Sequence, residues 1–285
     1  MIAIRKITWI FALSFLLFSC SKESGQGPDE KEPEDEQPQE SYDDLVLSKK
    51  PSGYWLASYG DASDLSGKKH DGAFKGPKTE RATLPNGDSA NAFDGEAAYL
   101  EIPDADHLEL TTTGELTIEA WMRPDVEDFP NVEKDKDYIH WMGKGTPGQH
   151  SWAARMYNKD SWREEDRSQR ISGYAFNLSG GLGAGSYFQD HIKPGTWVHY
   201  VLVINTNNTS SAYPTGYTII YRDGEKRQQR NLKDYDIIPG NGTAPIRIAT
   251  RDLGSFFLGA IGKVAIYDYE LSAEQLKENY LKMVN

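Results

Sequence analysis

Residues 138–190 are rich in aromatic, basic and amide side chains, the mixture that a sugar-binding surface requires. Sugar rings stack their C–H faces on aromatic rings, and their hydroxyls pair with amide, guanidinium and carboxylate groups. The glycines of GGLGAG (180–185) would let a polymer lie close to the backbone. The candidate carbohydrate contacts are Trp141, Lys144, Trp152, Arg155, Tyr157, Arg170, Tyr174, Asn177, Tyr187 and Gln189.

Two alternatives stay open for this region. It could instead be a long hairpin with Trp141 and Trp152 in the core and the glycines in a tight turn. If it does bind a glycan, an anionic chain would rely on the basic residues Arg155, Lys144 and Arg170. A neutral chain would rely on Trp141, Trp152 and Tyr187.

The glycine stretch does not match a phosphate-binding loop. GGLGAG spells neither G-x-G-x-x-G nor G-x-x-x-x-G-K-[ST]. The strand-like segment SYFQD (186–190) follows it, whereas a phosphate loop leads into a helix whose N–H groups face the anion. A nucleotide site is therefore excluded here.

The N-terminus indicates export and a lipid anchor. Two basic residues precede an apolar run (7–19) that is too short to span a membrane, so residues 1–19 are predicted to be a signal peptide. LFSC (17–20) resembles the lipobox of bacterial lipoproteins and ends at Cys20, the only cysteine, which excludes internal disulfides. An ordinary signal peptide with an incidental cysteine is the alternative.

Residues 20–44 are predicted to be a lipidated cysteine followed by a disordered acidic tether, because they contain almost no apolar side chain. Ser21-Lys22-Glu23 with acids downstream resembles the export signal of surface-displayed lipoproteins of some Gram-negative bacteria. The predicted location is the outer membrane, anchored by lipid and facing the exterior. A spacer facing the periplasm is the alternative.

Net charge argues against nucleic acid as a partner. The chain has a formal charge of −12. Residues 45–285 carry 27 basic and 33 acidic residues, and no basic stripe is visible along them. A nucleic-acid-binding domain would be expected to carry such a stripe.

Residues 45–285 are predicted to be one all-β domain, a jelly-roll sandwich of two antiparallel sheets with one short C-terminal helix. The helix is expected at 272–284, where Ser272 and Gln275 fit a capping box. Asp223-Gly224 predicts a hairpin turn, and 196–205, apolar on both sides, predicts a central strand. The strand-like segments are 98–103, 116–124, 196–205, 217–229, 246–250 and 258–271.

A family resemblance follows from six segments in order. These are SGYWLASYGDASDLSGKKHDGAFKG (52–76), NAFDGEAAYLEIPD (91–104), LTIEAWMRPD (116–125), GTWVHYVLVIN (195–205), YRDGEK (221–226) and GAIGKVAIYDYELSAEQLKENY (259–280). Together they resemble LamG-like domains of the concanavalin A-like lectin/glucanase superfamily. The resemblance implies a jelly roll of two curved sheets. It also implies glycan binding on the concave sheet or its rim loops, and often a calcium ion at one edge.

A calcium site would fall in GDASDLSGKKHDG (60–72). Asp61, Asp64 and Asp71 could offer the hard oxygen ligands that Ca²⁺ prefers. The spacing is not that of an EF-hand, so a turn held by aspartate hydrogen bonds alone is the alternative. A structural calcium ion is thus a possible cofactor, and no other cofactor is predicted.

Catalysis is weakly supported. The acidic E-x-D-x-x-E pattern of jelly-roll glucanases does not occur at a strand-like position, and no histidine pair has metal-binding spacing. Jelly-roll polysaccharide lyases use side-chain types that this chain offers at Arg155, Tyr174, Tyr187, Gln189 and His199, but their strand motifs are absent.

The sequence therefore favours a surface-anchored carbohydrate-binding lipoprotein whose partner is a polysaccharide or glycan. Such a protein would hold substrate for degrading enzymes, within a surface complex for polysaccharide utilisation. A lyase, or after it a glycoside hydrolase, on the same fold is one alternative. A protein-binding component of a surface complex is the other.

Overall fold

The computed structural model describes residues 40–162 and 164–285, and Glu40–Asn285 form one compact unit. The predicted signal peptide (1–19), Cys20 and the tether as far as residue 39 lie outside the described residues.

The folded unit begins before residue 45, which corrects the end of the predicted tether. Helix α1 (Tyr42–Ser48) starts within it, and the Ser41 hydroxyl accepts a hydrogen bond from the Asp44 amide at 3.0 Å. The Asp44 carboxylate accepts in return from the Ser41 amide, completing a capping box. Tyr42 and Val46 are buried, so packing stabilises a helix too short to form alone.

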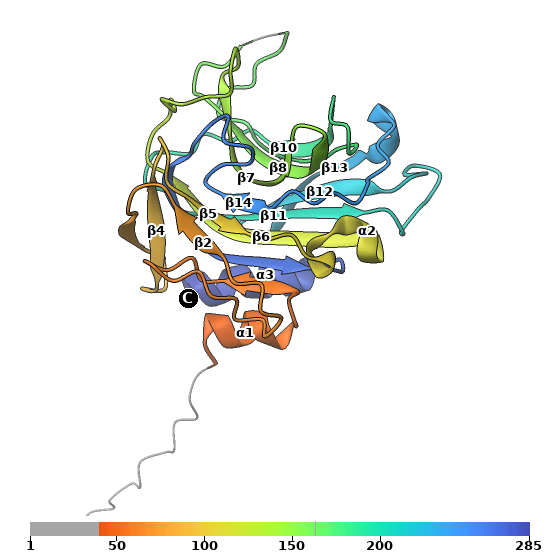
Figure 1. Cartoon of the computed structure of the whole chain (residues 1–285). Coiled ribbons are helices and arrows are strands. Elements are labelled where there is room, and N and C mark those ends of the chain that lie inside the picture. Colours follow the sequence, from red (N-terminus) through yellow and green to blue (C-terminus); the bar gives the residue numbers. More distant parts are fainter. Residues whose placement is uncertain (1–39, 163) are drawn as a thin grey trace, which may run out of the picture. The chain divides into compact units, whose positions relative to one another are not determined.

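An eight-stranded antiparallel sheet, sheet A, forms one layer of the sandwich (Figure 1). Seven of its strands lie in the order β13 (Glu225–Asn231), β12 (Tyr217–Arg222), β11 (Val198–Asn205), β6 (Glu115–Pro124), β15 (Leu258–Tyr267), β4 (Ser89–Asp94) and β3 (Glu80–Thr83). The eighth strand, β1 (Gly53–Trp55), pairs with β15.

A seven-stranded antiparallel sheet, sheet B, forms the other layer. Its order is β10 (Ala184–Phe188), β9 (Ile171–Ala175), β8 (Gln149–Tyr157), β7 (Tyr138–Thr146), β14 (Ile246–Ile248), β5 (Tyr99–Ile102) and β2 (Ala73–Lys75). The predicted two-sheet all-β architecture is confirmed. Every predicted strand segment contains a strand of one of the two sheets.

The main core lies between the sheets. All eight residues of β11 are buried, which confirms the predicted central strand. Side chains from both sheets meet there, among them Leu202 and Ile118 of sheet A and Trp152 and Met156 of sheet B. The β12–β13 hairpin turns at Asp223-Gly224, both with positive φ, as predicted.

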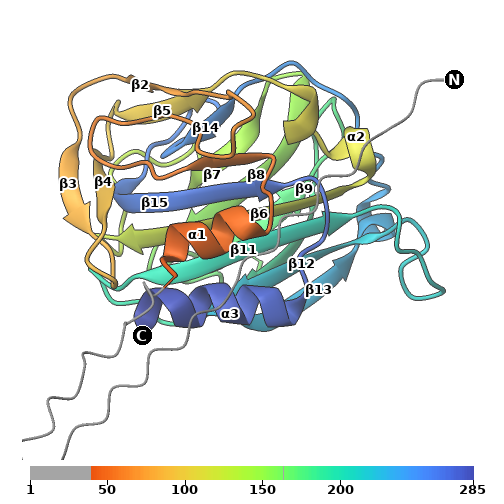
Figure 2. The ribbon, with the colours of Figure 1, turned by 90° about the horizontal axis from the view of Figure 1, so that it is seen from below.

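A second apolar cluster lies on the outer face of sheet A, beneath two helices. Figure 2 shows α1 and α3 (Ala273–Val284) lying side by side across this sheet. The Ser272–Gln275 capping box of α3 is confirmed. Tyr42 of α1 and Leu276 and Met283 of α3 pack against outward residues of the sheet such as Trp121.

The predicted C-terminal helix is confirmed, but it is not the only helix among the described residues. In addition to α1, the chain forms the one-turn helix α2 (Leu110–Thr113) and the 3₁₀ turns η1 (Asp106–Leu108) and η2 (Leu232–Tyr235). Within the described ranges, none of the helices combines the length and apolar character needed to cross a bilayer.

Candidate functional site

The outer face of sheet B carries aromatic and basic side chains at alternate positions of its strands. Along β8, Trp152 and Met156 point into the core, so Arg155 and Tyr157 point outward. The neighbouring strands add Tyr174 of β9, Tyr187 of β10 and Tyr138 of β7 to the same face. Because successive side chains of a strand point to opposite sides, each of these strands contributes residues both to the core and to the outer face.

These side chains surround a hollow of about 390 Å³. The glycine-rich turn between β9 and β10 forms part of its wall. A Cβ atom at Gly185 would come within 2.3 Å of the Tyr174 ring, so the glycine leaves room for that ring over β10. The hollow is lined by Lys136, Tyr138, Arg155, Tyr157, Glu165, Arg167, Arg170, Tyr174, Phe176, Gly181, Leu182, Gly183, Gly185, Tyr187, Arg230 and Tyr235.

Arg155 lies in this hollow between two tyrosine rings. Its guanidinium carbon is 4.0 Å from the ring centre of Tyr138 and 4.5 Å from that of Tyr174. One terminal nitrogen donates to the Tyr157 hydroxyl at 3.3 Å, whereas the buried Nε has no hydrogen-bond partner. Among the described residues, no carboxylate oxygen lies within 4.0 Å of this guanidinium. The side chain is therefore a half-buried cation that has no counter-ion in the part of the chain that the structure describes.

Tyr157 accepts hydrogen bonds from two guanidinium groups. Arg155 donates at 3.3 Å and Arg167 at 3.2 Å. Burial alone would raise the pKa of this phenol, but the two positive charges outweigh it and lower the pKa below its usual value. Burial raises the pKa of Tyr138 in the same hollow, so Tyr157 is the easier of these two tyrosines to ionise.

Arg170 is held by several partners at the edge of the hollow. It forms a salt bridge of 2.8 Å with Glu165 and donates to the Gln189 side-chain oxygen at 3.0 Å. Its guanidinium lies over the Tyr187 ring, 4.0 Å from the ring centre. Arg170 and Tyr187 together therefore form a rigid wall, which Gln189 supports.

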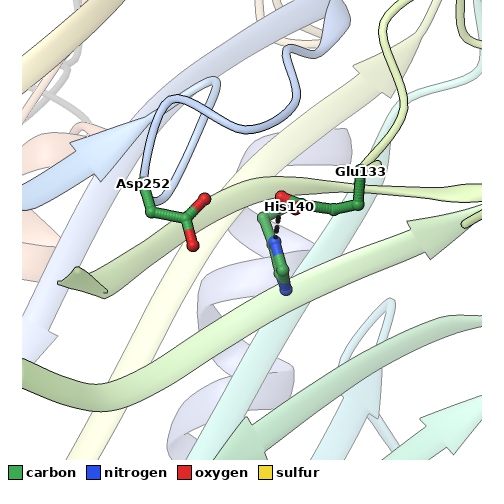
Figure 3. Close-up of side chains that lie close together, drawn as sticks. All are labelled: Glu133, His140 and Asp252. Carbon is green, nitrogen blue, oxygen red and sulfur yellow. Dashed lines mark hydrogen bonds and ion pairs between the residues drawn. The ribbon is translucent and has the colours of Figure 1, made fainter. Parts of the chain in front are cut away.

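His140 connects Arg155 to a carboxylate behind the hollow, that of Glu133, and Figure 3 shows the bond between His140 and Glu133. Its Nδ1 donates to Glu133 Oε1 at 2.7 Å, since a carboxylate can only accept. In the neutral ring Nε2 is then an acceptor, and an Arg155 nitrogen lies 3.4 Å from it. Ser255 also donates to Glu133 Oε1, at 2.8 Å. The arrangement fixes both the tautomer of His140 and the position of Arg155.

Glu133, His140 and Asp252 each place one possible metal ligand within 4.8 Å of the others (Figure 3). One nitrogen and two carboxylates would suit a divalent transition metal. However, Asp252 is already paired with Arg251, and Arg155 faces the imidazole. Burial, followed by the charges of Arg251 and Arg155, lowers the pKa of His140 well below its usual value. This positive surrounding disfavours a cation, so the group is better explained as support for Arg155.

Three predicted carbohydrate contacts are wrong because they are buried. Trp141 and Trp152 are 0% exposed and belong to the main core, in line with the hairpin alternative. Lys144 is 1% exposed and forms salt bridges with Asp104 at 2.5 Å and Glu109 at 2.9 Å. None of the three side chains offers a surface to a ligand.

The remaining predicted contacts separate into two groups. Arg155, Tyr157, Arg170, Tyr174 and Tyr187 line the hollow, although Tyr157 is only 1% and Arg170 only 6% exposed. Asn177 and Gln189 do not line it. The Asn177 side chain bonds the backbone of Asp236 and Ile238 in a neighbouring loop, and the Gln189 side chain accepts from Arg170.

Trp162 is the tryptophan that the residue-type argument should have favoured. It is 70% exposed, in the loop between β8 and β9. With Lys136 and Arg167, which also line the hollow, it borders an adjoining depression of about 720 Å³. The signal for its exposure is its place in KDSWREED (159–166), which is polar and does not alternate, unlike the strands that hold Trp141 and Trp152.

Other lining residues were missed because they come from distant segments. Arg230 lies on the edge strand β13 of sheet A, and Tyr235 lies in η2, where 49% of it is exposed. Leu182, in the glycine-rich turn, is 75% exposed. Only the folding of the chain brings these residues to the rim.

The predicted calcium ligands do not converge on one point. Asp64 accepts hydrogen bonds from the amides of Tyr54, Ser66 and His70, at 3.0, 2.9 and 2.9 Å. Asp71 accepts from the Asp64 amide, and Asp61 from the Ser63 amide. The possible metal group found among the described residues does not include these aspartates. The segment thus matches the alternative of a turn held by aspartate hydrogen bonds.

His199 does not belong to the hollow, which corrects its grouping with the possible lyase residues. It lies on β11 of sheet A, on the face that the helices cover, and is 0% exposed. Its Nε2 donates to Glu119 Oε1 at 2.7 Å. The Asn279 amide of α3 donates to both Glu119 oxygens, and Tyr42 of α1 donates to one of them.

A two-sheet antiparallel sandwich with an open polar and aromatic hollow on one sheet defines a lectin-like class of fold. The family model of the concanavalin A-like lectin/glucanases superfamily matches residues 94–277. The chain belongs to this superfamily. No curated protein matches the sequence.

Solved structures share the fold at low sequence identity. Domain 4 of AbnA, an extracellular arabinanase from Geobacillus stearothermophilus, solved with arabinotriose, is 14% identical with a TM-score of 0.55; the alignment covers 81% of this chain and 98% of that domain. The ligand-binding domain of botulinum neurotoxin serotype D, solved with N-acetylneuraminic acid, is 12% identical with a TM-score of 0.59. A botulinum neurotoxin DC binding domain, solved with rat synaptotagmin II, is 11% identical with a TM-score of 0.60.

Each botulinum alignment covers 83% of this chain. The present chain spans about half of each toxin domain, 52% in both cases. At these identities the likeness concerns the fold alone.

Proposed function

We propose that this protein binds a glycan in the hollow on the outer face of sheet B. The observation that carries the proposal is the hollow itself, where tyrosine faces and guanidinium groups lie together on an open sheet. Such a surface offers stacking for sugar C–H faces and charged donors for hydroxyls. The arabinanase domain solved with arabinotriose and the toxin domain solved with N-acetylneuraminic acid support glycan binding on this fold.

The glycan is expected to extend beyond the hollow. Lys136 and Arg167 line both the hollow and the depression beside Trp162, so a polymer can run from the hollow into the depression. This favours an oligosaccharide or polysaccharide over a single sugar.

The biological setting that we propose is the cell surface. A diacylglycerol on Cys20 would anchor the chain to the outer membrane, and the acidic tether would hold the folded unit away from it. Facing the exterior, the protein would hold polysaccharide near degrading enzymes in a surface complex.

A glycan array with the full chain tests the binding function. It is run once with calcium and once with a chelator, so that the possible calcium ion is tested too. Binding to a defined set of glycans supports the proposal. Silence on every glycan would contradict it and favour a protein partner in a surface complex.

Membrane fractionation tests the anchor. Cys20→Ala should move the protein from the membrane fraction to the soluble fraction, because the thiol that carries the lipid is lost. The neighbouring Ser21→Ala variant is the control and should stay with the membranes. If Cys20→Ala sediments with membranes as the wild type does, the lipoprotein proposal is wrong.

A lyase is the second candidate, and Tyr157 is the observation that favours it. A phenol whose pKa is lowered by two guanidinium groups is suited to proton exchange, but Tyr157 is only 1% exposed, so the rings around it must move before a sugar can reach its hydroxyl. Each glycan that binds should therefore be checked for new reducing ends and for ultraviolet absorbance of unsaturated products. Products that disappear in Tyr157→Phe would establish catalysis. Binding without products leaves the non-catalytic function.

A further inference from the structure

The hollow is strongly positive within an acidic protein. Among the described residues, its lining contains five basic side chains and a single carboxylate, that of Glu165. The whole chain, in contrast, has a formal charge of −12. A concave site lined by one sign of charge concentrates ligands of the opposite sign. The basic residues are Lys136, Arg155, Arg167, Arg170 and Arg230.

Arg155 differs from the buried basic residues elsewhere in the described ranges, because each of those has a carboxylate partner. Lys144 pairs with Asp104 and Glu109, Lys263 with Asp43 and Asp88, Arg170 with Glu165, Arg247 with Glu101, and Arg251 with Asp252. Removing a cation from water without an anion is costly, so proteins almost always pair it. The lone guanidinium in an open hollow is therefore suited to an anion supplied by the ligand.

The surroundings of Arg155 hold it ready for such an anion. The rings of Tyr138 and Tyr174 lie against the guanidinium on both strands beside β8. His140 accepts from behind at 3.4 Å and is itself held by Glu133. Every one of these contacts leaves the positive charge uncompensated, and the buried Nε keeps a free donor. A guanidinium fixed in this way loses little entropy when it binds an anion.

We infer that the glycan is acidic and that the anionic group of one sugar residue, a carboxylate or a sulfate ester, pairs with Arg155. This inference rests on the proposed glycan-binding function and specifies its ligand. Arg167, which reaches the same Tyr157 hydroxyl at 3.2 Å, lies close enough to share the anion. Neutral sugar residues would then stack along Tyr187 and Trp162.

The test compares acidic polymers with neutralised forms of the same backbone. The full chain is titrated with polygalacturonate and with the same polymer after its carboxylates are reduced to alcohols. A second pair is dextran sulfate and unmodified dextran, whose backbone carries no carboxylate. We expect at least one acidic polymer to bind at least about tenfold more tightly than its matched form, because a charged hydrogen-bonded pair is lost. The polymer pair whose acidic and neutral members bind with different affinities identifies the anion as carboxylate or sulfate.

Three variants link the effect to the hollow. Arg155→Gln should weaken binding of the acidic polymer about 10- to 100-fold and reduce the preference over the neutral form. The more exposed Arg167→Gln serves as a second variant if the first does not fold. Arg81→Gln removes an exposed positive charge from β3 of sheet A and should leave the affinity unchanged.

The outcomes separate the two proposals. If acidic and neutralised polymers bind equally, the acidic ligand is wrong and the glycan function stands. If Arg155→Gln and Arg167→Gln both keep the full preference for the acidic polymer, the anion lies elsewhere and the assignment to Arg155 is overturned. If none of the polymers binds and the glycan array is also silent, both proposals fail.

Discussion

The two outer faces of this sandwich each carry a histidine bonded to a carboxylate, but only one face is covered. On sheet A, His199 donates to Glu119 at 2.7 Å beneath α1 and α3. On sheet B, His140 donates to Glu133 at 2.7 Å beside an open hollow. A histidine–carboxylate hydrogen bond therefore lies under the covering helices on sheet A and supports an open site on sheet B.

The two hydrogen-bond networks differ in the groups that surround each carboxylate and histidine. The Glu119 carboxylate accepts from His199, Asn279, Tyr42 and Tyr267, so its capacity is used inside the protein. The chain from Glu133 ends instead at Arg155, a cation without a carboxylate partner among the described residues. A carboxylate that accepts from four buried side chains on a covered face indicates structure, and a cation without a carboxylate partner on an open face indicates a ligand.

The largest expected effect is on the covered face. Glu119→Ala should lower the free energy of unfolding by about 3–5 kcal/mol, because buried donors from both helices and the sheet lose their acceptor. Urea denaturation measures this loss. Glu80→Ala, an exposed glutamate on β3, is the matched control and should change it by less than about 0.5 kcal/mol. A loss of under about 1 kcal/mol in Glu119→Ala would mean that the network does not hold the helices.

The second prediction contrasts two tryptophans of sheet B and its loops. Trp152→Ala should cost about 3–5 kcal/mol of stability, because a large core side chain leaves a cavity. Trp162→Ala should leave stability unchanged within about 0.5 kcal/mol and weaken glycan binding about tenfold. Thermal or urea unfolding and a glycan titration give the two values. Full affinity in Trp162→Ala would remove the depression beside the hollow from the binding surface.

The third prediction concerns pH and His140. Burial and the nearby arginines hold its pKa well below the value of about 6.5 that applies in the unfolded chain. The unfolded chain therefore takes up a proton that the folded protein does not, so stability falls as pH drops below about 6.5 and this contribution is constant well above it. The fall in stability should be visible between pH 7 and pH 5, a range that includes the unfolded-state pKa.

His140→Gln should remove that part of the pH dependence, measured as the free energy of unfolding in urea at each pH. His107→Gln, at an exposed histidine whose side chain is 55% accessible, is the control and should keep it. An unchanged fall in stability between pH 7 and pH 5 in His140→Gln would show that the histidine is not held neutral by its surroundings.

The fold was largely predictable because its signals are local. Alternating apolar residues located the strands, Asp223-Gly224 located a hairpin, and Ser272 with Gln275 located α3. Helix α1 was missed, since its short sequence at the edge of an acidic segment becomes helical only through the burial of Tyr42 and Val46 against sheet A.

The site was predictable in its residue types and less so in its geometry. The two-residue period of β8 could have assigned Trp152 to the core and Arg155 to the surface. The exposure of Trp162 could have been inferred from its polar, non-alternating surroundings. The path from Glu133 through His140 to Arg155 depends on strand pairing and loop packing, which no local pattern reveals.

One measurement tests the central claim that the hollow is built for a ligand. Stability and affinity for the acidic polymer are determined on the same preparation of Arg155→Gln. We predict a free energy of unfolding equal to or higher than that of the wild type, with an affinity about 10- to 100-fold lower. A loss of more than about 2 kcal/mol in stability with unchanged affinity would contradict the claim and make Arg155 a structural residue, as Glu119 is on the covered face.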